Sequence, residues 1–242
     1  MSLKDDSFKK LRKEKAKWKV DSWEEYENKE KAFLRDQALS KEPTIKGQVR
    51  VTGGKYKNFL VDIPKNTRPL TDRMKTRIFD ILGSDISKKT VLDLYAGSGS
   101  FGLDSLSRGA TRVTFVDASK HAEKILKDNI KKIGILEGTE VIRMKVEEFL
   151  YKEQSTENVF EIIFLDPPYK LYNTKVTEKM ESVITLAANL LPANRLKKGR
   201  FKGAMIIKHP RRYPIGKLEF EKVKLAETFE FGLNSISLFI IK

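Results

Sequence analysis

The stretch VLDLYAGSGS, residues 91–100, indicates the fold of this chain. Residues 91–94 are an apolar run typical of a buried strand, and the loop after them contains Gly97-Ser98-Gly99. A second apolar run, FEIIFL at 160–165, leads into the turn Asp166-Pro167-Pro168-Tyr169. In an open parallel sheet, ligands bind beyond the carboxyl ends of the strands where the strand order reverses. The two turns therefore predict one shared crevice.

Strands and helices alternate from residue 89 onward, in the pattern of a doubly wound α/β domain. We expect strands at 90–95, 112–116, 140–144, 160–165 and 204–208, and helices at 101–108, 120–133, 146–151 and 174–191. Two extended segments follow, at 218–231 and 235–241, with no helix between them. They predict an antiparallel hairpin at the edge of the sheet.

The chain is expected to have three parts. Residues 1–46 alternate basic with acidic residues and carry few apolar ones, which predicts a charged helical extension. Residues 47–84 predict a β-hairpin and then a helix that Thr71 or Asp72 can cap. Residues 85–242 contain the α/β pattern and form the third part.

Composition limits the function classes. The chain has 242 residues and a formal net charge of +15, so a polyanionic partner is favoured: RNA, DNA or an anionic membrane surface. It has no cysteine and two histidines, which argues against disulfides and against a metal site. No apolar run reaches the length of a signal peptide or a membrane span. We expect a cytoplasmic protein that binds neither a metal nor a membrane.

Basic residues gather in two segments. Residues 195–217 contain nine lysines and arginines and no acidic residue, and residues 46–77 contain nine against two. Both segments also carry aromatic residues or glycines, as surfaces that follow a nucleic-acid backbone often do. A solvated basic face without a specific partner is the alternative interpretation.

Two cofactor classes fit the glycine loop. Residues 97–102, GSGSFG, satisfy the dinucleotide fingerprint, and Asp117 ends the next strand, where a carboxylate can bind a ribose. Asp93 favours another cofactor, because a carboxylate there repels a diphosphate and attracts the ammonium group of S-adenosylmethionine. A structural role, in which Asp93 accepts hydrogen bonds from loop amides, is the alternative.

The turn at 166–169 fits methyl transfer to an exocyclic amine of a nucleobase. Hydrogen bonds from the amine to the Asp166 carboxylate and to a carbonyl of Pro167 or Pro168 would free its lone pair, and Tyr169 could stack on the base. Proximity and electrostatics would then drive an in-line displacement at the methyl group. An ordinary proline turn that closes a strand is the alternative.

Residues 49–242 resemble the RsmD family of small-subunit rRNA guanine-N2 methyltransferases. The segments that carry the resemblance are VRVTGGKYKNFLVDIP, RPLTDRMKTRIFDIL, VLDLYAGSGSFGLDSLSRGA, VTFVDASKHAEKILKDNIKKIG and FEIIFLDPPYK. The resemblance implies a seven-stranded, Rossmann-like fold that uses S-adenosylmethionine. It further implies a monomer whose partner is ribosomal RNA or an assembling small ribosomal subunit.

The resemblance also implies roles for individual residues. Those expected to bind the cofactor are Asp93, Tyr95, Ala96, Gly97, Ser98, Gly99, Asp117, Ala118 and Glu147. Those expected to bind RNA or to close over the site are Lys55, Lys57, Arg68, Thr71, Asp72 and Arg73. Those expected to hold the target amine are Asp166, Pro167, Pro168 and Tyr169.

Three positions depart from the family pattern. Asp117 stands where the family usually has glutamate, and Lys145 stands where an aspartate commonly contacts adenine, which leaves Glu147 as the nearest replacement. Lys208 stands where an acidic residue is usual. Two other functions stay open: adenine-N6 methylation of DNA or RNA, and a non-catalytic RNA-binding assembly factor.

Overall fold

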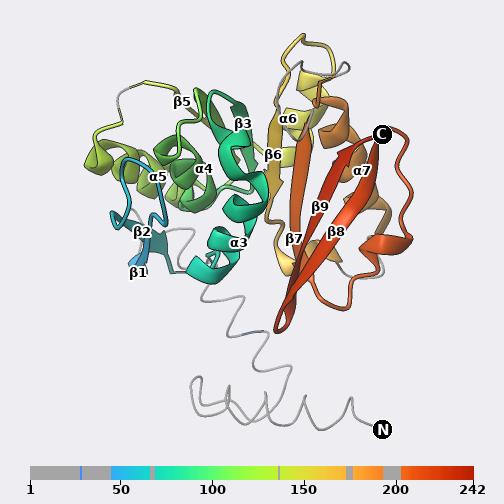
Figure 1. The fold of residues 1–242 in the computed structure, drawn as a ribbon, viewed down its shortest axis with the longest axis horizontal. Coiled ribbons are helices and arrows are strands. Elements are labelled where there is room, and N and C mark those ends of the chain that lie inside the picture. Colours follow the sequence, from blue (N-terminus) through green and yellow to red (C-terminus); the bar gives the residue numbers. More distant parts are fainter. Residues whose placement is uncertain (1–27, 29–44, 66–68, 136, 173–176, 193–202) are drawn as a thin grey trace, which may run out of the picture. The chain divides into compact units, whose positions relative to one another are not determined.

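The structure, a computed structural model, describes residues 28, 45–65, 69–135, 137–172, 177–192 and 203–242. The chain divides into two compact units, residues 1–44 and 45–242. Nearly all described residues belong to the second unit, whose ribbon is coloured from blue to red in Figure 1. The predicted charged helical extension, residues 1–46, lies almost entirely outside the described residues.

A seven-stranded sheet forms the centre of this unit, in the order β5-β4-β3-β6-β7-β9-β8 (Figure 1). The strands are β3 (Thr90–Leu94), β4 (Arg112–Asp117), β5 (Thr139–Arg143), β6 (Ile162–Leu165), β7 (Ala204–Pro210), β8 (Val223–Phe231) and β9 (Asn234–Ile241). The first five pair in parallel, and β9 lies antiparallel between β7 and β8. The predicted doubly wound sheet with an antiparallel C-terminal hairpin is confirmed, and its strand order reverses between β3 and β6.

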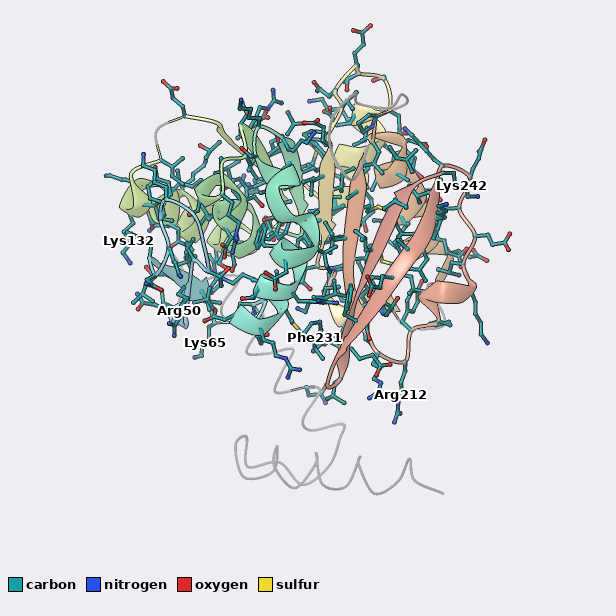
Figure 2. All side chains as sticks on the ribbon, in the orientation of Figure 1. Arg50, Lys65, Lys132, Arg212, Phe231 and Lys242 are labelled. Carbon is teal, nitrogen blue, oxygen red and sulfur yellow. The ribbon has the colours of Figure 1, made fainter. Side chains whose placement is uncertain are left out.

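Helices cover both faces of the sheet. They are α3 (Asp72–Leu82), α4 (Ser100–Ser107), α5 (Lys120–Ile133), α6 (Val146–Glu153) and α7 (Thr177–Asn189). One apolar cluster joins α3, α4 and α5 to one face, and a second joins α6 and α7 to the other. Leu92 belongs to one cluster and Val91 to the other, as expected for alternate side chains of a strand. Side chains occupy the space between the sheet and its helices (Figure 2). No helix among the described residues is long and apolar enough to cross a membrane.

The segment before β8 differs from the expected strand. Extended chain is predicted from residue 218, but β8 begins at Val223. A short 3-10 turn, η4 (Ile215–Lys217), precedes it, and the Leu218 amide donates to the Ile215 carbonyl at 3.2 Å. Ile215 and Phe220 are buried in the core. This segment therefore packs against the core through its side chains before strand pairing begins.

The predicted N-terminal hairpin is present and docks on α4. Its strands β1 (Ile45–Arg50) and β2 (Leu60–Pro64) pair antiparallel. In the loop between them, the Lys55 amide donates to the Ser107 carbonyl at 2.7 Å. Gly54 has a φ of +77°, and a Cβ there would lie 1.9 Å from the Ser107 carbonyl oxygen. Glycine at this position therefore permits both the backbone conformation and the close approach to α4.

A buried ionic cluster holds the same loop in place. Asp104 of α4 is fully buried, and its Oδ2 lies 3.2 Å from Nζ of Lys75, which is also buried. The Thr52 amide donates to the same carboxylate at 2.9 Å, and Arg108 Nε lies 3.3 Å from Oδ1. The Lys75 ammonium also donates to the Arg50 carbonyl. Asp104 thus connects α3, α4 and the hairpin loop.

Candidate active site

Two turns meet at the carboxyl ends of β3 and β6. They are the glycine loop (residues 95–99) and the Asp-Pro-Pro-Tyr turn (residues 166–169). Leu94 lies opposite Leu165 in the parallel register of the two strands, and the Asp166 amide donates to the Leu94 carbonyl at 3.3 Å. The two turns therefore begin side by side at the point where the strand order reverses, as predicted.

The glycine loop has an unusual backbone. Tyr95, Gly97 and Gly99 have φ angles of +60°, +56° and +75°. A positive φ is uncommon for a bulky residue such as tyrosine, and it brings the chain into a tight turn before α4. A Cβ on Gly99 would lie 2.3 Å from Leu126 Cδ1, so glycine also allows α5 to pack closely.

Two hydroxyl groups in this region are buried without a hydrogen-bond partner among the described residues. They are Tyr95 Oη, in the first residue of the glycine loop, and Ser100 Oγ, in the residue just after it. Buried polar atoms are normally hydrogen-bonded, because an unsatisfied one costs about 1–3 kcal/mol. Both atoms are therefore suited to contact a polar ligand on the loop.

Asp93 is held against the first turn of α4. Its side chain is buried in β3, and its Oδ2 accepts a hydrogen bond from the Gly102 amide at 2.9 Å. Burial raises the pKa of Asp93 well above its usual range, and the nearby carboxylates of Asp166 and Asp117 add to this rise. The structural role considered for Asp93 is thus observed for one of its oxygens. No described residue donates a hydrogen bond to the other oxygen.

Asp117 joins the ends of β3 and β4. Its Oδ2 accepts from the Gly97 amide at 2.9 Å, and its Oδ1 accepts from the Ser119 amide at 2.8 Å. Burial raises the pKa of Asp117, although these two hydrogen bonds oppose the shift. Each carboxylate oxygen can accept a second hydrogen bond, so Asp117 can still receive hydroxyl groups of a ligand. Ala118, the next residue, is exposed.

Lys145 and Glu147, which follow β5, each form an ion pair with a different residue. Lys145 precedes α6, is exposed, and pairs through Nζ with Glu148 Oε1 at 3.0 Å. Glu147 pairs instead with Lys179 at 2.9 Å. Partial burial would raise the pKa of Glu147, but the hydrogen bond and charge of Lys179 outweigh it and lower the pKa. Burial, and to a smaller extent the charge of Glu147, raise the pKa of Tyr95.

The Asp-Pro-Pro-Tyr turn carries an ion pair that sequence patterns did not predict. Asp166 Oδ2 lies 2.8 Å from Nζ of Lys208 in β7, and the two side chains are 22% and 7% exposed. Burial raises the pKa of Asp166, and the charge of Lys208 partly opposes this rise. The Pro168 carbonyl accepts from the Leu171 amide at 2.9 Å. The Pro167 carbonyl accepts no hydrogen bond from a described residue.

Two tyrosines anchor this turn to neighbouring strands. The Tyr169 hydroxyl donates to Asn234 Oδ1 at the start of β9, and the Tyr169 side chain stays partly exposed. The Tyr172 hydroxyl donates to the Lys208 carbonyl at 2.6 Å. Lys208 thus contacts the turn through its ammonium group at Asp166, and the residues just after the turn through its carbonyl at Tyr172.

The start of α3 holds three of the predicted substrate residues. Thr71 caps the helix, since its Oγ1 accepts from the Met74 amide at 3.3 Å. Asp72 pairs with Arg50 of the hairpin at 2.9 Å. Arg73 is exposed, and its guanidinium lies 5.8 Å from the centre of the Phe231 ring in β8.

The other predicted substrate residues lie elsewhere. Lys55 and Lys57 are exposed in the hairpin loop, and the Lys55 amide is bonded to Ser107 at the C-terminal end of α4. The glycine loop lies at the opposite end of that helix, about 12 Å away along an axis with a rise of 1.5 Å per residue. Arg68 lies outside the described residues.

Asn129 connects the hairpin to the glycine loop and was not predicted from the sequence. It is fully buried on α5, and its Nδ2 donates to the carbonyls of Ser98 at 3.2 Å and Asp62 at 3.0 Å. Its Oδ1 accepts from the Asp62 amide at 2.9 Å. The available signal was a polar residue on the face that also carries Leu126 and Ile133.

The chain is similar in sequence to one protein family and to several of its curated members. The family described as conserved hypothetical protein 95 matches residues 49–201. Ribosomal RNA small subunit methyltransferase D of Haemophilus influenzae is 35% identical over 130 residues, which cover 52% of this chain and 67% of that protein. The Escherichia coli protein of the same name is 31% identical over 128 residues, covering 51% and 62%. The chain thus spans 67% of the length of the first of these relatives and 62% of the length of the second.

Solved structures share the fold. A hypothetical protein of Thermus thermophilus superposes with a TM-score of 0.62 at 26% identity, covering 78% of this chain and 98% of that one. An S-adenosylmethionine-dependent methyltransferase from Agrobacterium tumefaciens gives 0.56 at 17% identity, covering 76% and 67%. A protein complexed with S-adenosylhomocysteine gives 0.55 at 17% identity, covering 76% and 54%. The chain therefore has the Rossmann-like fold of S-adenosylmethionine-dependent methyltransferases.

Proposed function

The chain belongs to the RsmD family, described as conserved hypothetical protein 95, and from this membership we propose a specific activity. The protein transfers a methyl group from S-adenosylmethionine to the exocyclic N2 amine of a guanine in small-subunit ribosomal RNA. The observation that carries the proposal is the position of the glycine loop beside the Asp-Pro-Pro-Tyr turn, where the Asp166 amide bonds to the Leu94 carbonyl. Free rRNA or an assembling small subunit is the proposed partner.

The residues of the glycine loop fit the proposed cofactor. When bound, S-adenosylmethionine supplies a methyl group that its sulfonium makes electrophilic. The second oxygen of Asp93 is the proposed partner of the ammonium group, whose charge would favour the ionised form of this carboxyl. Asp117 can receive the ribose hydroxyls, and the buried hydroxyls of Tyr95 and Ser100 can bond to the remaining polar atoms. Glu147 is the carboxylate proposed for the adenine side.

The Asp-Pro-Pro-Tyr turn would hold the target amine. Lys208 occupies Asp166 Oδ2, and no described residue donates to Oδ1, which can therefore accept one N–H of the amine. The Pro167 carbonyl can accept the second N–H, so the nitrogen lone pair points away from the turn and toward the glycine loop. The partly exposed ring of Tyr169 can stack on the base. Orientation and fixed charges supply the acceleration.

Cofactor binding gives the first expected result. S-adenosylhomocysteine at a hundred times its Kd stabilises a protein by about 2.7 kcal/mol, which raises Tm by roughly 5–10 °C for a chain of this size. NADH should leave Tm unchanged, because Asp93 disfavours a diphosphate. Asp93→Asn should weaken the shift, whereas Glu219→Gln, a change at an exposed carboxylate with no proposed role, should not. Stabilisation by NADH without stabilisation by S-adenosylhomocysteine contradicts the proposed cofactor.

The substrate assignment is tested by methyl transfer. The protein is incubated with tritiated S-adenosylmethionine and undermethylated small ribosomal subunits, and the labelled nucleoside is identified after digestion. We expect N2-methylguanosine. Labelled N6-methyladenosine would instead assign the turn to the adenine reaction, and cofactor binding without any transfer would favour the RNA-binding assembly factor.

The Lys208–Asp166 pair predicts a pH effect. Asp166 must be ionised to accept both the ammonium of Lys208 and the amine, so activity is lost as the pH falls through its raised pKa. The negative charge of Asp166 contributes in turn to the raised pKa of Asp93 and of Tyr172. Lys208→Met removes the ammonium group that opposes the rise in the pKa of Asp166. The acid limb of the kcat profile should therefore move to higher pH.

Lys208→Arg is the matched control for this prediction because it keeps the positive charge. Its acid limb should stay close to that of the unchanged protein. On the acid side, each unit by which the pKa rises lowers the rate about tenfold at a given pH. Superimposable profiles for Lys208→Met and the unchanged protein would show that Asp166 does not set the acid limb.

A further inference from the structure

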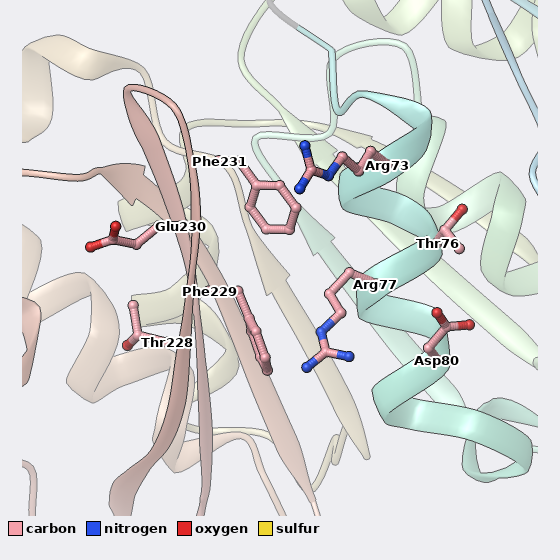
Figure 3. A pocket seen from close by; sticks show the side chains of 8 residues that line it. All are labelled: Arg73, Thr76, Arg77, Asp80, Thr228, Phe229, Glu230 and Phe231. Carbon is pink, nitrogen blue, oxygen red and sulfur yellow. The ribbon is translucent and has the colours of Figure 1, made fainter.

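A groove separates α3 from β8, the edge strand of the sheet (Figure 3). Its volume is about 580 Å³. The residues that line this α3–β8 groove are Arg73, Thr76, Arg77, Asp80, Thr228, Phe229, Glu230 and Phe231. None of the contacts proposed above for the target amine or the cofactor involves this groove.

Two arginine–phenylalanine pairs face each other across the groove. The guanidinium of Arg77 lies 4.3 Å from the centre of the Phe229 ring, and that of Arg73 lies 5.8 Å from Phe231. Four residues of a helix rise about 6 Å and two residues of a strand about 6.7 Å, so the pairs repeat with nearly the same spacing on both walls. The groove therefore has two successive steps, each with a guanidinium over an aromatic ring. A base that stacks on the ring displaces the guanidinium, which can then pair with a phosphate.

The two acidic residues that line the groove, Asp80 and Glu230, form no ion pair with Arg73 or Arg77 among the described residues. Figure 3 shows Glu230 on the side of β8 that faces away from α3, where its Oε2 pairs with Arg211 at 2.7 Å. Asp80 points to the far side of α3 in the same view. Glu227 lies 3.9 Å from Arg77, and Arg73 makes no ion pair with a described residue. Flat aromatic faces beside arginines suit single-stranded nucleic acid, because bases stack on the rings and phosphates pair with the guanidinium groups.

One end of the groove lies next to the Asp-Pro-Pro-Tyr turn. Phe231 is opposite Asn234 in the antiparallel register of β8 and β9. The side chain of Asn234 accepts the hydrogen bond of the Tyr169 hydroxyl. A chain of nucleotides that leaves a base at Tyr169 can therefore continue directly over Phe231 and Phe229.

We propose that the α3–β8 groove binds the single-stranded nucleotides that flank the target guanosine. Their bases stack on Phe229 and Phe231, and their phosphates pair with Arg73 and Arg77. This inference rests on the proposed function, because it describes how the same RNA substrate is held. It goes beyond that function by requiring an unpaired flank on the substrate, since a duplex keeps its base faces covered.

The test measures RNA affinity with a fluorescein-labelled oligonucleotide of twelve uridines, by anisotropy at several salt concentrations. Loss of one stacking platform costs about 1–3 kcal/mol per base, so Phe229→Ala should weaken binding about five- to hundredfold. Phe229→Leu keeps apolar volume without an aromatic face and should weaken binding similarly, whereas Phe229→Trp should preserve it. A duplex of the same length should respond to none of the three changes.

The salt dependence separates this groove from a general basic surface. Arg73→Ala should flatten the slope of log affinity against log salt by about 0.7, the value for one contact with a single strand. Lys224→Ala removes an exposed charge of β8 outside the groove and should change the slope less. Equal slopes for Arg73→Ala, Lys224→Ala and the unchanged protein would overturn the inference.

The same variants are assayed for S-adenosylhomocysteine binding and for methyl transfer to ribosomal subunits. If the unchanged protein transfers methyl groups and the Phe229 and Arg73 variants bind the uridine oligonucleotide as it does, the groove assignment is wrong and the proposed function stands. If the unchanged protein neither binds S-adenosylhomocysteine nor transfers methyl groups, the proposed function itself fails. Melting temperatures of the variants identify any loss of binding that comes from unfolding.

Discussion

Asp166→Ala should lower kcat for methyl transfer by about a hundredfold to a thousandfold, the usual effect of removing one oriented hydrogen-bonding group from a reacting centre. The carboxylate is proposed to hold the amine, and Oδ1 receives no hydrogen bond from a described residue that would prevent this. The Kd for S-adenosylhomocysteine should change little, because no contact proposed for the cofactor passes through Asp166. Single-turnover rates and calorimetry measure the two effects separately.

A second variant distinguishes catalysis from folding. Asp166→Ala also removes the carboxylate that pairs with Lys208, whose side chain is 7% exposed, so the variant should be less stable. Asp166→Ala combined with Lys208→Met removes both charges and should recover stability without recovering activity. Recovery of activity in the double variant, or full activity in Asp166→Ala, would show that the turn has only a structural role.

Asp104→Ala should destabilise the second unit by about 3–5 kcal/mol, a large share of the 5–15 kcal/mol that typically holds a domain together. Asp104 is fully buried and is the carboxylate that neutralises the buried Lys75. Its loss also leaves the Thr52 amide without the acceptor that now lies 2.9 Å away. Urea unfolding followed by circular dichroism measures the change in the free energy of unfolding.

Two controls test the cause of this effect. Asp72→Ala breaks an ion pair between exposed side chains, with Arg50, and should cost at most about 1 kcal/mol. Asp104→Ala with Lys75→Met removes the buried charge as well as its partner, and should be more stable than Asp104→Ala alone. Equal losses for Asp72→Ala and Asp104→Ala would mean that the buried cluster contributes no more than a surface pair.

The periodicity of the sequence predicted most of the strands and helices, the segment before β8 excepted. The expected helix at 120–133 is observed at Lys120–Ile133, and the expected strand at 112–116 at Arg112–Asp117. Such elements follow from contacts between residues close in the chain: an apolar repeat of two or about 3.6 residues, a capping serine or threonine, and glycine at a turn. The loop at 95–99 and the turn at 166–169 were predicted for the same reason.

Two expectations for site residues changed once the hydrogen-bond and ion-pair partners of these residues were known. Asp93 was expected to serve a ligand, and the fold gives one of its oxygens to the Gly102 amide. Lys145 was expected to disturb the adenine contact, and the fold turns it to Glu148 at 3.0 Å. In both cases a residue of the folded chain binds the side chain that was expected to contact the cofactor or to disturb its binding.

By itself, the sequence determined the alternation of strands and helices, the two turns and the chemistry that their residues permit. Only the tertiary structure decided which side chains meet. The register of β6 against β7 brings Lys208 to Asp166 across 42 residues, and the hairpin brings Asp62 to Asn129 across 67. Such pairs form because burial removes charged and polar groups from water. A buried group is then stabilised by a partner that the packing of the chain brings within hydrogen-bonding distance.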